Sequence, residues 1–237
     1  MREKSLRDVD THYCPGCGHG IVHRLVADAV DELGIRTKTI GVTPIGCAVV
    51  AYDYWNFDCA ESAHGRALAV ATAIKRIEPE KIVFTYQGDG DLAAIGTAET
   101  IHAANRGENL TVIFVNNAVY GMTGGQMAPT TLLNQKTATT PRGRSKENDG
   151  LPLKISELVA RLPAVYSVER VSCDSPQEIR KAKNAIKAAF QNQIDKKGFS
   201  LVEVLSMCPT YWNMSAVESL SWIKNVMCKE FPLGKIK

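Results

Sequence analysis

Residues 81–91 read KIVFTYQGDGD, and residues 110–117 read LTVIFVNN. Each stretch begins with a short β-branched and aromatic run that is typical of a buried strand, and each ends in a polar cluster. Residues 92–106, between them, have a helical pattern that ends at Gly107. A strand, a helix and a second strand at this spacing predict a βαβ unit within a parallel sheet.

The rest of the chain continues this alternation. Further strand patterns cover residues 39–42, 165–171 and 200–205, and further helical patterns cover residues 21–33, 65–77 and 176–194. We therefore predict an α/β fold with a mostly parallel sheet and helices on both faces. Because no linker divides two cores, we expect a single domain over residues 1–237 that ends in a C-terminal extension. The long irregular stretch of residues 118–152 is typical of a functional or mobile loop.

Composition and charge exclude several classes of protein. Of the 237 residues, 45% are hydrophobic and 22% are charged, unlike a disordered, collagen-like or coiled-coil chain. No apolar run approaches the ~20 residues that a membrane helix needs, and the charged N-terminus lacks the apolar region of a signal peptide. The net charge of +3 comes from scattered side chains. We therefore expect a cytoplasmic protein with no nucleic-acid or membrane partner.

The polar clusters after the two strands suggest a site for a diphosphate and a metal ion, because ligands of open α/β sheets bind beyond the carboxyl ends of the strands. Gly88 and Gly90 permit a tight turn and close approach of a diphosphate to the main chain. Asp89 and Asn117, with a carbonyl of the following turn, could supply the few protein oxygens that Mg²⁺ prefers beside phosphate oxygens. The alternative is that both clusters are ordinary turns.

Cysteine is unusually abundant, with seven residues, and without a secretion signal we expect no disulfide framework. Cys14 and Cys17 form a CxxC pair, which is compatible with half of a zinc site, a redox pair or an iron–sulfur pair. Cys47 and Cys208 each follow a strand, at the sheet edge that carries GDGD. Four thiolates at one edge could bind a [4Fe–4S] cluster.

The stretch GDGDLAAIG at residues 88–96, followed by NNAVYGMTGGQ at residues 116–126, resembles the thiamine diphosphate motif of the 2-oxoacid:ferredoxin oxidoreductases, in their β subunit. The resemblance implies a thiamine diphosphate-binding fold in which Asp89, Asn117 and the carbonyl of Val119 ligate Mg²⁺. The cofactor-binding residues that it implies are Gly46, Cys47, His64, Gly88, Asp89, Gly90, Asp91, Asn117, Val119, Tyr120, Gly121, Met122 and Thr123.

The same resemblance covers the cysteines. The family's β subunit holds a [4Fe–4S] cluster through a CPGC pair, a Cys after a Gly and a late Cys-Pro, which implies a cluster on Cys14, Cys17, Cys47 and Cys208. The N-terminal segment would then be cluster-binding. The three other cysteines match no ligand position, and we interpret them as structural: Cys59, Cys173 and Cys228.

The activity implied by the resemblance is oxidative decarboxylation of a 2-oxoacid to acyl-CoA and CO₂, with electrons passed through the cluster to ferredoxin. The stretch YGMTGGQMAPTT at residues 120–131 looks most like the 2-oxoisovalerate branch, with the 2-oxoglutarate enzymes as the alternative. In this family an α subunit supplies the activating Glu, and γ and ferredoxin-like δ subunits complete the complex. No catalytic residue can be assigned in this chain.

Two other functions remain open from the residues alone. A non-redox thiamine diphosphate decarboxylase or carboligase would leave the four cysteines unexplained. A non-enzymatic, metal-binding electron-transfer module would leave the GDGD and NN pair unexplained. The basic side chains of the long loop could meet a carboxylate or coenzyme A, but we expect them to be solvated: Lys136, Arg142, Arg144 and Lys146.

Overall fold

The computed structural model describes residues 5–237, and its core is one sheet with the strand order β2-β1-β3-β4-β6-β5-β7. Neighbouring strands are parallel except for β7, which is antiparallel to β5. The strands are β1 Thr39–Pro44, β2 Asp58–Ser62, β3 Ile82–Gly88, β4 Thr111–Asn116, β5 Val165–Ser172, β6 Phe199–Leu205 and β7 Gly234–Lys235. The predicted α/β fold with a mostly parallel sheet is confirmed.

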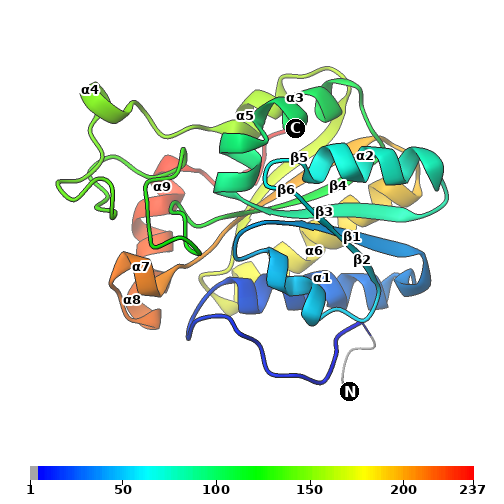
Figure 1. The fold of residues 1–237 in the computed structure, drawn as a ribbon, viewed down its shortest axis with the longest axis horizontal. Helices are drawn as coiled ribbons and strands as arrows, with labels where there is room; N and C mark the ends of the chain where they lie inside the picture. Colours follow the sequence, from blue (N-terminus) through cyan, green and yellow to red (C-terminus); the bar gives the residue numbers. More distant parts are fainter. Residues whose placement is uncertain (1–4) are drawn as a thin grey trace.

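Helices cover both faces of this sheet (Figure 1). The helices α1 His19–Glu32 and α6 Pro176–Ile194 bury apolar side chains such as Val26 and Phe190 against one face. The opposite face is covered by α2 Ala67–Ile77, α3 Thr97–Asn105 and α5 Ile155–Ala160. The start of α6 shows why the chain enters a helix there: Ser175 accepts a hydrogen bond from the Glu178 N–H, and Pro176 occupies the first turn.

Short helices lie beyond the carboxyl ends of the strands and in the long loop (Figure 1). They are α4 Lys146–Asp149, α7 Pro209–Trp212, α8 Ala216–Trp222 and α9 Cys228–Glu230, together with a 3₁₀ turn at Val49–Asp53 and a π-helical turn at Ile223–Met227. Another 3₁₀ turn, Arg36–Lys38, directly precedes β1. Within residues 5–237, no helix is both long and apolar enough to cross a membrane.

The helix expected over residues 92–106 is divided in the structure. Asp91–Ile95 forms a π-helical turn, and α3 begins only at Thr97. Gly96 stands at the junction, where a Cβ would lie 2.6 Å from the Asp91 carbonyl oxygen and 2.7 Å from the Gly65 carbonyl oxygen. The sequence pattern also gave no indication of β2 and β7, which are edge strands with exposed residues.

The loop of residues 118–152 is held together from inside by Arg144, which is only 4% exposed. Its guanidinium donates hydrogen bonds to six main-chain carbonyls of the same loop, so the expectation that this side chain is solvated is wrong. Lys136, Arg142 and Lys146 are exposed, as expected. Burial of Arg144 was not evident from its neighbours in sequence, since its partners are carbonyl groups that every residue carries.

A buried ion pair joins β5 and β6. Arg170 and Glu203 are each about 1% exposed, and Arg170 Nε donates to Glu203 Oε2 at 2.8 Å. Glu203 also accepts hydrogen bonds from Asn116 Nδ2 at 2.7 Å and from the Ser156 hydroxyl. Both carboxylate oxygens are therefore satisfied, as a buried charge requires.

Replacing Arg170 with methionine should leave the Glu203 carboxylate buried without a cation. Loss of one member of a buried pair typically costs ~3–5 kcal/mol, and we expect the free energy of unfolding to fall by that amount. Urea titration of the full chain measures this change. The matched change at the exposed Arg161, Arg161→Met, should cost less than about 0.5 kcal/mol. Equal stability of the two variants would contradict the role given to the pair.

Candidate active site

The carboxyl ends of β1, β3 and β4 form one pocket. The pairing of Gly88 with Val115 and of Asn116 with Leu205 places the exits of β3, β4 and β6 side by side. The structure brings all thirteen residues of the expected cofactor-binding set to the lining of this pocket, together with His19, Ile45 and Ala48, which were not expected. The pocket encloses about 570 Å³, part of it open to solvent.

Asp89 is one of two buried acids of this pocket, with an exposed fraction of 3%. Its Oδ1 accepts a hydrogen bond from the Gly90 N–H at 2.9 Å. Its Oδ2 accepts from the Val119 N–H at 3.2 Å and from the Thr130 hydroxyl at 2.9 Å. Burial raises the pKa of Asp89 to about 7, although these three hydrogen bonds oppose the rise. A nearby cation would therefore be needed to stabilise the ionised form of Asp89.

Asn117 lies beside Asp89 because the chain turns sharply after β4. Ala118 adopts a left-handed conformation with φ 57°, and the Val119 N–H then points back toward both side chains. It lies 3.2 Å from Asp89 Oδ2 and 3.3 Å from Asn117 Oδ1. The turn is also held from outside, since Trp212 Nε1 donates to the Asn117 carbonyl at 3.0 Å. Two side-chain oxygens from residues that follow different strands thus converge on the Val119 N–H.

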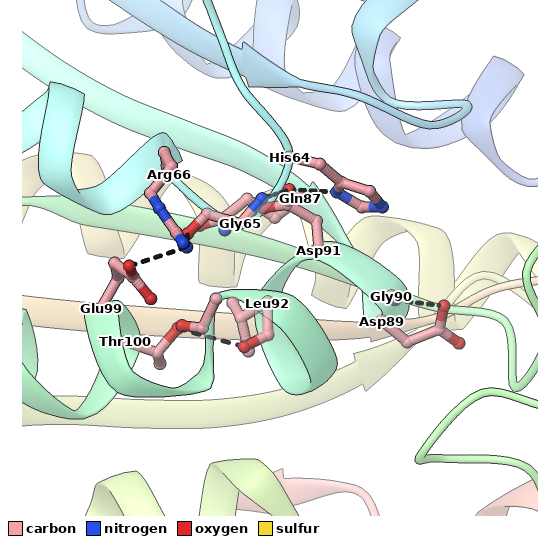
Figure 2. A network of polar contacts seen from close by, with 11 residues as sticks. His64, Gly65, Arg66, Gln87, Asp89, Gly90, Asp91, Leu92, Glu99 and Thr100 are labelled. Carbon is pink, nitrogen blue, oxygen red and sulfur yellow. Dashed lines mark hydrogen bonds and ion pairs between the residues drawn. The ribbon is translucent and has the colours of Figure 1, made fainter.

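Asp91 has a different environment, shown in Figure 2. Its Oδ1 accepts from His64 Nδ1 at 2.7 Å and from the Gly65 N–H at 2.5 Å, and its Oδ2 accepts from Gln87 Nε2 at 2.5 Å. Asp91 therefore joins the end of β3 to the segment before α2. This contact occupies His64 Nδ1, and His64 also lines the pocket.

The glycines of the pocket serve two different purposes. A Cβ on Gly88 or Gly46 would meet no protein atom within 4 Å, so both leave open space where a ligand could approach the main chain. A Cβ on Gly90 would lie 2.8 Å from the Tyr120 ring, so Gly90 permits Tyr120 to pack against the GDGD turn. Space for a bulky polyanion and a closely packed wall are thus both present.

The four cysteines of the expected cluster site lie in one neighbourhood. A Cβ on Gly121 would be 3.2 Å from Cys47 Sγ and 3.6 Å from Cys208 Sγ, so these two sulfurs face the same point. The loop with Cys14 and Cys17 is fixed next to Cys208, because the Gly18 N–H donates to the Met207 carbonyl at 3.1 Å. Within residues 5–237, no three His, Cys, Asp or Glu side chains are close enough to hold a single metal ion.

Burial raises the pKa of three of these thiols, those of Cys17, Cys47 and Cys208, and repulsion from neighbouring thiolates adds to the effect. The pKa is raised to about 11 for Cys17 and to about 12 for both Cys47 and Cys208. Cys173 also has a pKa raised to about 12 by burial, and its thiol donates to the Leu205 carbonyl at 3.4 Å. A thiol with a pKa raised in this way is protonated at neutral pH unless a metal stabilises its thiolate.

Three residues around the pocket have partners that sequence reasoning did not identify. Thr130 binds Asp89, Trp212 binds the Asn117 carbonyl, and His19 Nδ1 lies 2.8 Å from the Tyr86 hydroxyl. Burial lowers the pKa of His19 to about 3, so its ring is neutral. The CPGCGHG motif contained His19, and the stretch after GMTGG contained Thr130, but only the fold shows which atoms they meet.

Known proteins resemble this chain in sequence and in structure. Residues 44–204 match the family described as thiamine pyrophosphate enzyme, C-terminal TPP binding domain. The ketoisovalerate oxidoreductase subunit VorA of Methanothermobacter thermautotrophicus is 54% identical over 96% of this chain and 48% of its own length. The 2-oxoglutarate synthase subunit KorB of Methanocaldococcus jannaschii is 40% identical over 90% of this chain and 73% of its own length.

A solved structure agrees with these matches. The 2-oxoglutarate:ferredoxin oxidoreductase from Magnetococcus marinus, with 2-oxoglutarate, coenzyme A and succinyl-CoA bound, superimposes with a TM-score of 0.81 at 28% identity, over 95% of this chain and 73% of that one. The chain spans about half the length of VorA and about three quarters of KorB. It belongs to the thiamine pyrophosphate-binding enzymes, in the family of 2-oxoacid oxidoreductase subunits that includes VorA and KorB.

Proposed function

We propose that this chain is the β subunit of a 2-oxoacid:ferredoxin oxidoreductase and that 2-oxoisovalerate is its substrate. The reaction would convert the 2-oxoacid and coenzyme A to acyl-CoA and CO₂, and ferredoxin would receive the electrons. The observation that carries the proposal is the pocket of Asp89 and Asn117, which lies within the residues that match the thiamine pyrophosphate-binding family.

The residues around Asp89 fit a magnesium ion that binds a diphosphate. Among the described residues, the hydrogen-bond donors to Asp89 are neutral groups, so a divalent cation would supply the missing positive charge. The ligands would be Asp89, Asn117 Oδ1 and the Val119 carbonyl, and phosphate oxygens would complete the shell. The diphosphate would occupy the space that Gly46 and Gly88 leave open. When bound, thiamine diphosphate supplies a nucleophilic carbon and an electron sink for decarboxylation.

The pocket itself gives a reason to expect a partner subunit. Within residues 5–237, the acids that line it are Asp89 and Asp91. Asp89 is the proposed Mg²⁺ ligand, and Asp91 accepts hydrogen bonds from His64, Gly65 and Gln87, so we assign neither of them to the aminopyrimidine ring of the cofactor. We therefore assign that role to a Glu of a partner α subunit. We also propose γ and ferredoxin-like δ subunits, so that this chain acts only within a complex.

The four cysteines fit a [4Fe–4S] cluster better than a single metal ion. In such a cluster each iron takes one thiolate, so the four ligands lie farther apart than those of one ion. The nearness of Cys47 Sγ and Cys208 Sγ to one point, and the hydrogen bond from Gly18, next to Cys17, to Met207, next to Cys208, support this proposal. Iron would also stabilise thiolates that burial otherwise disfavours.

The substrate proposal follows from the sequence identity to the two relatives and from the residues that line the pocket. Identity to VorA is 54%, against 40% to KorB. Of the described residues, those that line the pocket include no lysine or arginine, whereas Ile45 and Met122 present exposed apolar side chains there. An apolar branched 2-oxoacid suits this lining, because the second carboxylate of 2-oxoglutarate would lack a cation. The alternative is a 2-oxoglutarate enzyme like KorB.

For the complex that contains this chain, we expect kcat/KM to be at least about tenfold higher for 2-oxoisovalerate than for 2-oxoglutarate, since leaving a charged group unpaired in an apolar site costs more than a tenfold factor. Reduction of ferredoxin in the presence of coenzyme A measures both rates. A higher value for 2-oxoglutarate would identify the KorB-like alternative and contradict the substrate proposal.

Asp89→Ala should abolish the retention of thiamine diphosphate while the fold stays intact, because it removes the charged ligand of the proposed Mg²⁺ site. Calorimetry with Mg²⁺ and thiamine diphosphate measures the affinity, and circular dichroism checks the fold. The exposed Glu80→Ala is the matched loss of a carboxylate away from the pocket. Unchanged affinity in Asp89→Ala would refute the Mg²⁺ assignment.

Cys208→Ser should lose or damage the cluster, whereas Cys173→Ser should not. Both cysteines are buried, so the pair separates ligation from burial. Iron and acid-labile sulfide are determined on protein that is purified without oxygen, and the unaltered chain should contain about four of each. Equal iron content in the two variants would show that this ligand set is incorrect.

A further inference from the structure

Two adjacent threonines connect the strand ends that carry the proposed metal ligands. Thr130 Oγ1 donates to Asp89 Oδ2 at 2.9 Å, and Thr131 Oγ1 donates to the Ala118 carbonyl at 2.7 Å. Both threonines are fully buried. Since Ala118 lies between Asn117 and Val119, this dipeptide holds the turn after β3 and the turn after β4 at the same time.

Arg144 in turn holds this dipeptide. Its Nη1 donates to the Pro129 carbonyl at 2.8 Å and to the Thr131 carbonyl at 2.6 Å, on either side of Thr130. A longer contact of 3.3 Å reaches the Ala128 carbonyl. One planar guanidinium therefore fixes the path of the main chain on both sides of the hydroxyl that binds Asp89.

The rest of the guanidinium anchors the dipeptide to the far side of the loop. Nε donates to the Gly150 carbonyl at 2.9 Å, and Nη2 donates to the carbonyls of Asp149 and Leu151 at 3.2 and 2.8 Å. The Leu153 N–H adds a hydrogen bond to the Pro129 carbonyl at 2.9 Å. Arg144 thus joins residues 128–131 to residues 149–151, but it does not line the pocket.

We propose that Arg144 is a positioning residue for the magnesium–diphosphate site, and that it acts through Thr130 on Asp89 and through Thr131 on the Asn117–Val119 turn. This inference rests on the proposed function, since it concerns the same site. Mg²⁺ requires nearly ideal octahedral geometry, with ligands at about 2.0–2.1 Å, so small displacements of Asp89 against Asn117 weaken its binding.

Lysine cannot replace arginine in this role. The guanidinium of Arg144 reaches six carbonyl oxygens, because Nη1 faces residues 128–131 while Nε and Nη2 face residues 149–151. The ammonium of a lysine has three N–H donors on a single nitrogen and cannot reach both segments. Arg144→Lys keeps the charge but leaves several carbonyls without a donor. The loop should then hold Thr130 and Thr131 less firmly, while the sheet and its core remain unchanged.

The test compares Arg144→Lys with Arg142→Lys, the same change at an exposed arginine of the same loop. Calorimetry on the full chain, as it is isolated with its partners, gives the Mg²⁺ concentration needed for half-maximal binding of thiamine diphosphate. We expect this concentration to rise roughly tenfold in Arg144→Lys, as for the loss of a good hydrogen bond to a charged group, and to stay unchanged in Arg142→Lys.

A comparison of Ca²⁺ with Mg²⁺ shows whether Arg144 positions the metal ligands or only supports the fold. Ca²⁺ accepts longer and less regular coordination than Mg²⁺, so Arg144→Lys should lose less affinity when Ca²⁺ replaces Mg²⁺. An equal loss with both ions would indicate a merely structural role and overturn the inference.

A second pair of variants keeps the proposal testable if Arg144→Lys does not fold. Thr130→Val removes the hydroxyl that binds Asp89 and keeps the shape, and it should raise the Mg²⁺ requirement. Thr130→Ser restores the hydroxyl and should recover most of the affinity. Equal Mg²⁺ requirements in Thr130→Val, Thr130→Ser and the unaltered chain would overturn the inference. Failure of the unaltered chain to bind thiamine diphosphate with Mg²⁺ would instead overturn the proposed function.

Discussion

The buried carboxylate of Asp89 is the constraint on which the rest of the site depends. Removing a carboxylate from water is costly unless donors and a positive charge replace the lost hydration. The donors come from three places in the chain: the Gly90 N–H in the GDGD turn, the Val119 N–H after β4, and the Thr130 hydroxyl in the long loop. None of these donors carries a positive charge. The buried carboxylate therefore still lacks a counter-charge, which a bound cation would supply.

The register of the parallel sheet brings these donors together. Because β3 and β4 pair through Gly88 and Val115, Asp89 and Asn117 leave the sheet side by side. The buried Glu203 supports this alignment from β6, since it accepts a hydrogen bond from Asn116 Nδ2, and Asn116 Oδ1 accepts one from the Ala118 N–H. A slip of one residue would turn these side chains to the opposite face and separate them. Fold and site therefore have the same physical basis.

The sequence was sufficient where a feature depends on residue types close together in the chain. The strands before GDGD and NN are apolar runs, and the polar residues after them identify the edge that forms the pocket. The sequence was insufficient for features that depend on contacts between segments far apart in the chain. The π-helical turn at Asp91–Ile95 ends at Gly96, which closely approaches Gly65, a residue distant in sequence. The burial of Arg144 depends on main-chain carbonyls, which the sequence pattern does not reveal. The segment with Cys14 and Cys17 lies next to Cys208 because the loop before α1 is hydrogen-bonded to the segment after β6.

Gly121 explains how one turn can serve two sites. The place of a Cβ on this residue is 3.2 Å from Cys47 Sγ, 3.6 Å from Cys208 Sγ and 4.0 Å from Asn117 Nδ2. A larger side chain would have to displace the sulfurs or the amide that stands beside Asp89. The residue therefore keeps the proposed cluster ligands next to the proposed magnesium ligands, with no side chain between them.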